Sequence, residues 1–206
     1  MSSLRASVPD GVLAGAMVSL GGAVLLSCEN RVTGAVLFCI ALLSICYFGF
    51  NLYTGKVGFL LRDHSPAALK NTFLGLLGNL LGTLLVGALI AAALPSLREA
   101  AFSACEKRLA QLPLQTLIRG FFCGVLMYTA VWIYREKKTV TGILFCIPVF
   151  ILSGFEHSIA DMFYFALAGL FFRGESLVFL LIVVLGNSLG GLFIPAVQAL
   201  KGAENL

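Results

Sequence analysis

Residues 153–161 read Ser-Gly-Phe-Glu-His-Ser-Ile-Ala-Asp, a polar island inside an otherwise apolar stretch at 141–172. The island places two carboxylates and an imidazole, Glu156, His157 and Asp161, within six residues. Ionisable groups at mid-membrane depth are costly unless they face protein, water or a solute. We therefore expect these residues to belong to a functional site inside a membrane.

The composition indicates a polytopic membrane protein rather than a soluble globule, because 59% of the residues are hydrophobic and 12% are charged. Its 206 residues allow about six spans of roughly 20 residues each, surrounded by membrane lipid. The sequence predicts an all-α fold whose six hydrophobic segments lie at 11–27, 32–53, 70–94, 114–134, 140–172 and 177–199. The fifth is too long for one straight span, and the second continues beyond Thr54-Gly55-Lys56, so we expect spans 2 and 5 to be broken helices.

The distribution of basic residues predicts the orientation, since cytoplasmic loops are enriched in Lys and Arg. If the amino terminus is in the cytoplasm, the cytoplasmic side holds these basic residues: Arg5, Lys56, Arg62, Lys70, Arg135, Lys137, Lys138 and Lys201. The outer side then holds Arg31, Arg98, Lys107, Arg108, Arg119 and Arg173. We expect a multi-pass protein of the cell inner (plasma) membrane with both termini in the cytoplasm. The net charge of +4 says little about partners, because basic residues flank membrane spans in any case, and we expect no nucleic-acid partner.

The six cysteines form no Cys-x-x-Cys pair and no Cys/His ligand spacing, so we expect small packing residues and neither a metal nor a cofactor. One alternative concerns Cys28, which follows Leu25-Leu26-Ser27 as in a bacterial lipoprotein signal. Cleavage there would remove the first span and leave an odd number of spans.

The chain carries an internal repeat. Residues 77–82 read Leu-Gly-Asn-Leu-Leu-Gly and residues 185–190 read Leu-Gly-Asn-Ser-Leu-Gly. At nearly the same offset, Gly49-Phe50 matches Gly154-Phe155. Each half is a span, a broken span and a Gly-Asn span, and an odd number of spans forces the halves to insert in opposite orientations.

We therefore expect one membrane channel domain over 1–206, with inverted halves at about 11–94 and 114–200. In such repeats the working site lies near the midplane, where the two broken helices meet. The glycines of the Gly-Asn segments, spaced i, i+4, are expected to let helices approach closely. Asn79 and Asn187 are expected to hydrogen-bond backbone groups that the breaks leave free.

The breaks are the expected site of the chemistry. Ser158-x-x-Asp161 has the spacing of a capping box with Asp in place of Glu, which predicts a half-helix starting at Ser158. Thr54 is the predicted cap of the half-helix after the first break. Both helix amino termini would point to mid-membrane, where their partial positive charge favours an anion over a cation. His157 would then lie at the constriction.

Residues 94–113 differ from the spans. Apolar Leu97, Ala101, Cys105 and Leu109 recur every four residues, opposite charged residues. The pattern fits an interfacial helix between the halves, and a plain linker fits nearly as well.

Residues 153–163 closely resemble the central signature of the formate/nitrite transporter family, which usually reads Gly-Phe-Glu-His-Ser-x-Ala-Asn-Met. Residues 52–55 resemble the family's Leu-Phe-Thr element in its first broken helix. Arg119-Gly120, Cys123 and Ala130-Val131-Trp132 resemble its fourth span. The resemblance implies an aquaporin-like protomer, a homo-pentamer with one pore per protomer, and passage of small monovalent anions: formate, nitrite, hydrosulfide or short monocarboxylates. It also implies that His157 is the central pore histidine and Thr54 its partner.

This sequence differs from the family pattern at four positions that bear on substrate preference. Asn51 stands where the family often has Glu, and Lys56 where a small polar residue is usual. Gly124 replaces a common Asn, and Asp161 replaces the signature Asn.

The expected substrate pathway comprises His157, Thr54, Lys56, Phe155 and Tyr53. The expected structural supports are Glu156, Ser158, Asp161, Asn79, Asn187 and Asn51. Lys56 would raise the anion concentration at the cytoplasmic mouth or, equally, extend to lipid headgroups. Glu156 is expected to form buried hydrogen bonds rather than to touch the solute.

Protons are the second expected partner. Protonating a carboxylate of pKa near 4 at pH 7 costs about 4 kcal/mol, comparable to the penalty of a bare anion in an apolar pore. An anion could therefore cross as its neutral acid if His157 supplies the proton.

Three other functions fit parts of the sequence. Ser158, His157 and Asp161 contain the groups of a hydrolase triad, but local spacing does not establish triad geometry, so we expect no enzyme. Glu156, His157 and Asp161 could serve an intramembrane metal transporter, although ligands are scarce. An aquaporin-like pore for neutral solutes would need paired Asn-Pro-Ala elements, which are absent.

Overall fold

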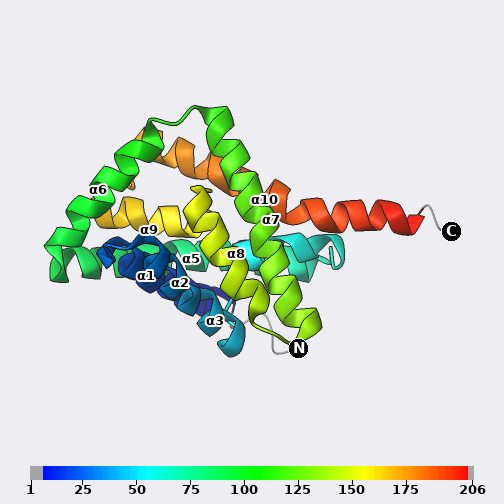
Figure 1. Cartoon of the computed structure of the whole chain (residues 1–206). Coiled ribbons are helices and arrows are strands. Elements are labelled where there is room, and N and C mark those ends of the chain that lie inside the picture. The colour runs from blue at the N-terminus through cyan, green and yellow to red at the C-terminus, as the bar shows by residue number, and fades with distance from the viewer. Residues whose placement is uncertain (1–6, 204–206) are drawn as a thin grey trace.

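The computed structural model describes residues 7–203, and Arg5 of the charge count lies outside them. The elements are α1 Ser7–Ser27, α2 Arg31–Leu37, α3 Cys39–Phe48, α4 Tyr53–Lys56, the 3-10 helix η1 Val57–Leu61, α5 Pro66–Ala93, α6 Pro95–Leu109, α7 Pro113–Lys137, α8 Thr141–Ser153, α9 Ser158–Ala168 and α10 Gly174–Ala203. Figure 1 shows α6 as a strap between the two halves, consistent with the helix predicted there.

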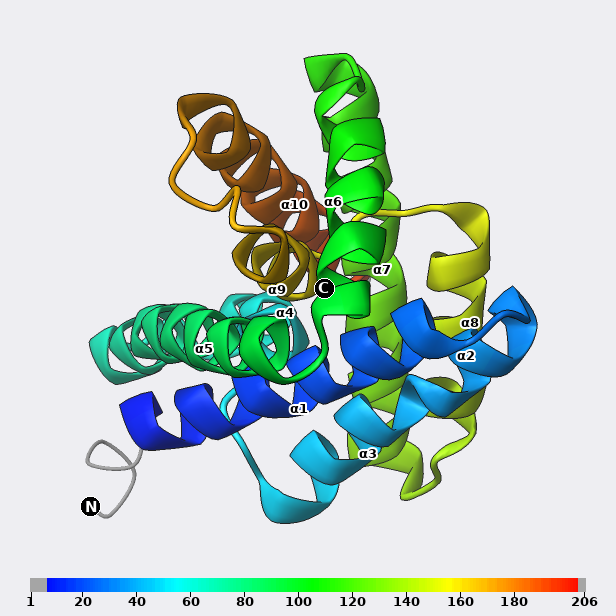
Figure 2. The same ribbon diagram turned by 90° about the vertical axis from the view of Figure 1, so that its left-hand side faces the viewer.

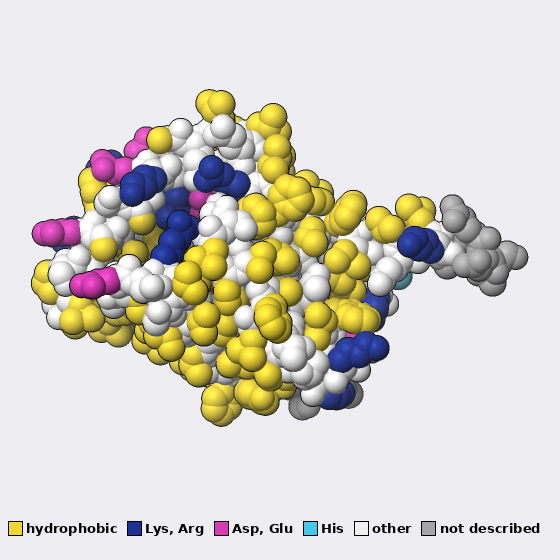
Figure 3. Space-filling model, in the orientation of Figure 1, with side chains coloured by type: hydrophobic (Ala, Val, Ile, Leu, Met, Phe, Trp, Pro, Cys, Tyr) yellow, Lys and Arg dark blue, Asp and Glu magenta, His cyan; other side chains and the backbone are white. Residues whose placement is uncertain are grey.

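The six predicted hydrophobic segments are confirmed. Among the described residues, five helical stretches are long and apolar enough to span a membrane: Ser7–Ser27, Arg31–Phe48, Pro66–Ala93, Pro113–Lys137 and Gly174–Lys201. The sixth span is the pair α8 and α9, which is bent by 55° at its break. Figure 3 shows apolar side chains over most of the visible face, with charged side chains gathered toward its ends. This distribution suits a protein whose middle faces lipid.

The two halves are each built on one close helix pair, α1 with α5 and α7 with α10 (Figures 1 and 2). Glycines allow the two helices of each pair to approach closely. A Cβ added at Gly78 would lie 2.5 Å from the carbonyl oxygen of Val8, and one at Gly186 would lie 2.6 Å from that of Leu117. Any larger residue would force these backbones apart, as expected for small-residue helix interfaces in membranes.

Both broken spans end their first helix in the same way. Gly49 and Gly154 have φ of 75° and 72°, the left-handed region that favours glycine. The next residue then closes the helix end: Phe50 N–H donates to Ile45 O, and Phe155 N–H donates to Phe150 O, each at 3.0 Å. The matching Gly-Phe pairs in the sequence therefore mark two equivalent breaks.

The helices that follow the breaks are unequal, and neither is capped as predicted. The first break leads only into the single turn of α4 and then η1; Thr54 lies inside α4, and Leu52 precedes it without a side-chain cap. The second leads into α9, which begins at Ser158 as predicted. Its cap is His157, because the cap position needs extended backbone and His157 has it, with φ −111° and ψ 111°. The predicted capping box of Ser158 and Asp161 is therefore wrong.

Candidate functional site

The two breaks meet at a hydrogen bond between Thr54 and His157. Thr54 Oγ1 lies 2.8 Å from His157 Nε2, and both side chains are buried. Thr54 comes from α4, and His157 directly precedes α9, so each half contributes one partner. The inverted arrangement thus brings together two residues that are far apart in the chain.

The surrounding hydrogen bonds assign the tautomer of His157. Its Nδ1 accepts from the backbone N–H of Ala160 at 3.2 Å, which is the helix cap of α9. A nitrogen that accepts carries no hydrogen, so the neutral ring is protonated at Nε2 and donates to Thr54 Oγ1. The hydroxyl hydrogen of Thr54 is then available to donate to a solute. A doubly protonated ring would lose the cap bond.

Three cavities adjoin one another, and His157 lines two of them, whereas Thr54 lines none. The two larger cavities are called outer and inner after the orientation expected from the sequence, and the small one between them is called central. The outer cavity has about 430 Å³, the central one about 10 Å³ and the inner one about 190 Å³. Phe38, Phe150 and His157 line both the outer and the central cavity, and Leu42, Ile45 and Leu52 line both the central and the inner cavity. The central cavity has about the volume that one water needs, so it is the constriction.

Apolar residues that the sequence reasoning missed complete the constriction. The ring of Phe150 stacks on His157 with centroids 5.7 Å apart, and Leu52 is 2% exposed on the inner side. Both could have been found from the breaks themselves. Phe150 supplies the carbonyl that closes the helix before Gly154, and Leu52 directly precedes α4.

Of the remaining predicted pathway residues, two line a cavity and one does not. Phe155 lines the outer cavity and stacks on Phe122 with centroids 5.4 Å apart. Lys56 lines the inner cavity. The hydroxyl of Tyr53 lies 2.7 Å from Ser188 Oγ on α10, and Tyr53 lines none of the three cavities.

Asn79 satisfies the backbone at the first break. Its Oδ1 accepts from Tyr53 N–H at 2.9 Å, and its Nδ2 donates to Asn51 O at 2.8 Å and to Gly11 O at 2.9 Å. Asn51 in turn donates from Nδ2 to the carbonyl of Asn71 at 2.9 Å. These bonds replace those that an unbroken helix would make, and they join the break to α1 and α5.

Asn187 makes the equivalent bonds at the second break. Its Oδ1 accepts from Ser158 N–H at 2.8 Å, and its Nδ2 donates to Glu156 O at 2.9 Å and to Gly120 O at 2.8 Å. The hydrogen bonds predicted for Asn79 and Asn187 are therefore present. Ser158 Oγ itself is buried, with no hydrogen-bond partner among the described residues.

The comparisons with known proteins agree with this geometry. The family model described as formate/nitrite transporter matches residues 2–200. The chain belongs to this family. It is similar to the nitrite transporter NirC of Escherichia coli, with 29% identity over 211 residues covering 88% of this chain and 78% of the relative. It is also similar to the formate channel FocA of Haemophilus influenzae, with 25% identity over 149 residues covering 65% and 52%.

Two solved structures share the fold. One, titled FNT family ion channel, has a TM-score of 0.84 at 24% identity, covering 96% of this chain and 90% of its own. The other, titled pentameric formate channel with formate bound, has a TM-score of 0.81 at 22% identity, covering 98% and 100%. As a formate/nitrite transporter, the chain is a multi-pass membrane channel for anions of the formate and nitrite type and not an enzyme.

Asp161, which stands where the family signature has Asn, has an ion-pair partner in the structure. Arg108 of α6 extends its Nε to Asp161 Oδ1 at 2.9 Å and to Glu156 Oε2 at 3.0 Å. Gln111 also donates from Nε2 to Glu156 Oε1 at 2.6 Å. Burial lowers the pKa of Arg108, but the carboxylates of Asp161 and Glu156 outweigh it and raise that pKa above its ordinary value. This partner could not be predicted from the sequence, because Arg108 is far from the island in the chain.

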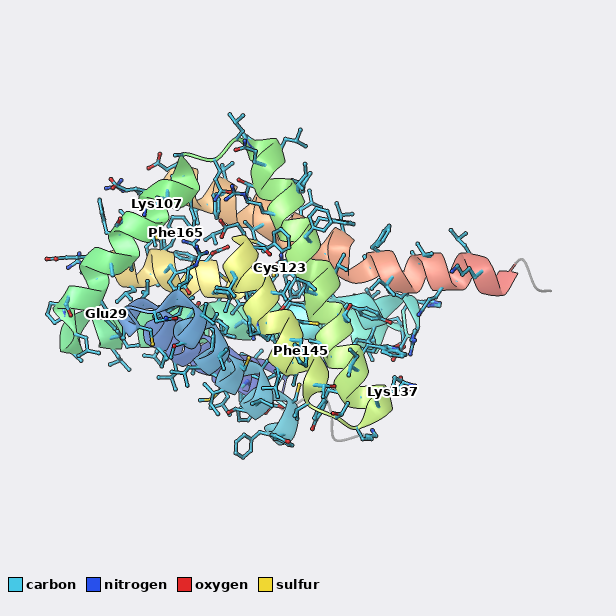
Figure 4. All side chains as sticks on the ribbon, viewed as in Figure 1. Glu29, Lys107, Cys123, Lys137, Phe145 and Phe165 are labelled. Carbon is cyan, nitrogen blue, oxygen red and sulfur yellow. The ribbon has the colours of Figure 1, made fainter. Side chains whose placement is uncertain are left out.

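The outer cavity of this transporter is rich in basic side chains: Arg31, Lys107, Arg108 and Arg119 line it, with Glu156 and Asp161. Figure 4 labels Lys107 on α6 and Lys137 at the far end of α7, which mark opposite ends of the molecule. Basic groups at a wide mouth raise the local concentration of anions.

Proposed function

We propose that this protein passes small monovalent anions, namely formate, nitrite, hydrosulfide or short monocarboxylates, through a pore within each protomer. The observation that carries the proposal is the hydrogen bond between Thr54 and His157 at the constriction. It supports a route along the three cavities, because His157 lines the narrowest one among apolar side chains and is held by Thr54, whose hydroxyl hydrogen is free to donate.

We also propose that a proton can be exchanged at His157 during passage. The neutral ring donates its Nε2 hydrogen to Thr54, whose hydroxyl can donate to an anion. To give up a proton and remain neutral, the ring must first gain one at Nδ1, which costs the cap bond to Ala160. Proton exchange is therefore a transient event coupled to loosening of the first turn of α9, and the neutral ring is the resting state.

We propose a homo-pentamer in the inner membrane with both termini cytoplasmic, on the basis of family membership and the basic cluster at 135–138. In this orientation the inner cavity opens to the cytoplasm. Native mass spectrometry of the purified protein should give five copies. A stable tetramer would contradict the assembly.

Flux measurements in proteoliposomes test the proposed function. The wild-type protein should take up formate and nitrite, and Thr54→Val, which keeps size but removes the hydroxyl, should lower both rates at least tenfold. Thr33→Val, the same substitution at an exposed position of α2, is the hydroxyl-removing control. Uptake of glycerol without anion uptake would instead establish a pore for neutral solutes.

A further inference from the structure

The inner cavity carries two basic side chains whose combined role is not explained by the constriction. Lys56 of α4 and Arg135 of α7 both line this space of about 190 Å³. The rest of its lining is uncharged: Leu42, Ile45, Cys46, Gly49, Phe50, Leu52, Gly55, Val131 and Tyr134. Because Leu42, Ile45 and Leu52 also line the central cavity, an ion held here lies directly before the constriction.

Both cations are held by the fold. Lys56 is half-buried at the end of α4, directly before η1. The guanidinium of Arg135 lies over the ring of Phe59, 4.5 Å from its centroid. Beside Arg135, Tyr134 donates its hydroxyl to Cys46 O at 3.3 Å, which ties α7 to α3. The cavity wall is therefore built from α3, α4 and α7, with α7 contacting the other two.

Neither Lys56 nor Arg135 forms a salt bridge within the part of the chain that the structure describes. Within residues 7–203, no Asp or Glu oxygen comes within 4.0 Å of Lys56 or Arg135, whereas Arg62 pairs with Glu136 at 3.3 Å. Two positive groups that face one small cavity repel each other. A bound anion would convert this repulsion into two attractions, and the planar guanidinium matches a carboxylate or a nitrite in shape.

We propose that Lys56 and Arg135 form an inner anion-binding site, which holds one formate-type anion at the cytoplasmic mouth before it passes Leu52. This proposal rests on the proposed function in one respect, that the bound anion is the transported one. The site would set the concentration at which transport from the inside saturates. The constriction, with Thr54 and His157, would set the maximal rate.

The kinetic test uses proteoliposomes sorted by orientation, with formate supplied to the cytoplasmic face. Lys56→Gln and Arg135→Gln should each raise the half-saturating formate concentration roughly threefold to fivefold, and the double variant about tenfold. The maximal rate should change less than the half-saturating concentration. Lys137→Gln is the matched control, since Lys137 lies two residues from Arg135 outside the cavity lining and should leave both values unchanged.

A binding test does not depend on transport. Broadening of the ¹³C-formate signal by the purified wild-type protein should be reduced in the double variant and retained in Lys137→Gln. Suppose that wild-type vesicles conduct no formate but the broadening is present in the wild type and reduced in the double variant. The proposed function then fails and the site stands. If vesicles conduct but neither half-saturation nor broadening changes in the double variant, the site is wrong and the function stands.

The lipid composition separates a soluble anion from a lipid headgroup. The shift in half-saturation should be equal in vesicles of phosphatidylcholine alone and in vesicles that also contain phosphatidylglycerol. A shift confined to the anionic vesicles would show that the two cations bind lipid phosphate, and it would overturn the proposal. So would a fall in maximal rate without a shift, which indicates a structural role.

Discussion

Replacing His157 by Asn should abolish the relay while keeping the break intact. Asn is a good N-cap residue, so its Oδ1 can accept from Ala160 N–H in place of Nδ1. It cannot gain and lose a proton in the physiological range. The variant therefore separates the titrating role of His157 from its role as the cap of α9.

The size of the effect follows from the constriction. Its cavity of about 10 Å³ admits no hydration shell, so a formate ion without a proton donor must cross bare or as the neutral acid. Forming that acid at pH 7 costs about 4 kcal/mol, a factor of about a thousand in rate. We expect the variant to lose up to this factor at pH 7. The deficit should shrink about tenfold for each pH unit below 7, because the fraction of neutral acid in solution rises tenfold.

The assay is uptake of radiolabelled formate into proteoliposomes between pH 5 and pH 8. Nitrate, whose conjugate acid is very strong, should cross the wild type and the variant at similar rates, since protonation does not help it. His64→Asn, in the exposed loop before α5, is the matched control and should behave as wild type. If His157→Asn keeps the wild-type pH profile for formate, His157 is structural and the relay is refuted.

Three further changes test the structure around the site. Asn187→Leu leaves buried backbone groups at the second break without partners and should cost about 2–6 kcal/mol, seen as a lower unfolding midpoint in detergent; an unchanged midpoint would contradict this. Arg108→Gln leaves the buried carboxylate of Asp161 without an ion-pair partner among the described residues, while Glu156 keeps Gln111 and Arg119; it should cost about 3–5 kcal/mol, with partial recovery in the double variant that adds Asp161→Asn, and failure to recover would assign the loss to α6 itself. Gly190→Val should lower the unfolding midpoint in detergent, because an added Cβ meets the backbone of α7 and forces α7 and α10 of the protomer apart, whereas Gly174→Val, in open space, should leave the midpoint unchanged.

Local features of the sequence predicted the scaffold. The lengths of the apolar segments give the six spans, and the two Gly-Phe pairs give the breaks at Gly49 and Gly154. Both signals are local, since a span needs a minimum apolar length and a left-handed helix end needs glycine. The two Gly-Asn segments also predicted which amides satisfy the breaks.

Tertiary contacts decided what the sequence could not. Asp161 has the spacing of a capping residue, but its carboxylate binds Arg108 of α6, and the extended backbone of His157 makes that residue the cap. The first break looked equivalent to the second, yet it is followed by only one α-helical turn. Phe150 and Leu52 are ordinary apolar residues in the sequence, and only their positions beside the breaks make them walls of the constriction.

The charges of this channel change along the pathway in a way that suits conduction. The wide outer and inner cavities carry full positive charges, represented by Lys107 on one side and by Lys56 and Arg135 on the other. The constriction carries none at rest, because the cap bond keeps the ring of His157 neutral and leaves the hydroxyl of Thr54 as the donor. A fixed cation at the narrowest point would hold an anion too tightly to release it, since conduction requires binding strong enough to enter and weak enough to leave. Cations at the mouths attract anions where water screens the charge, and a neutral donor at the centre guides them without trapping them.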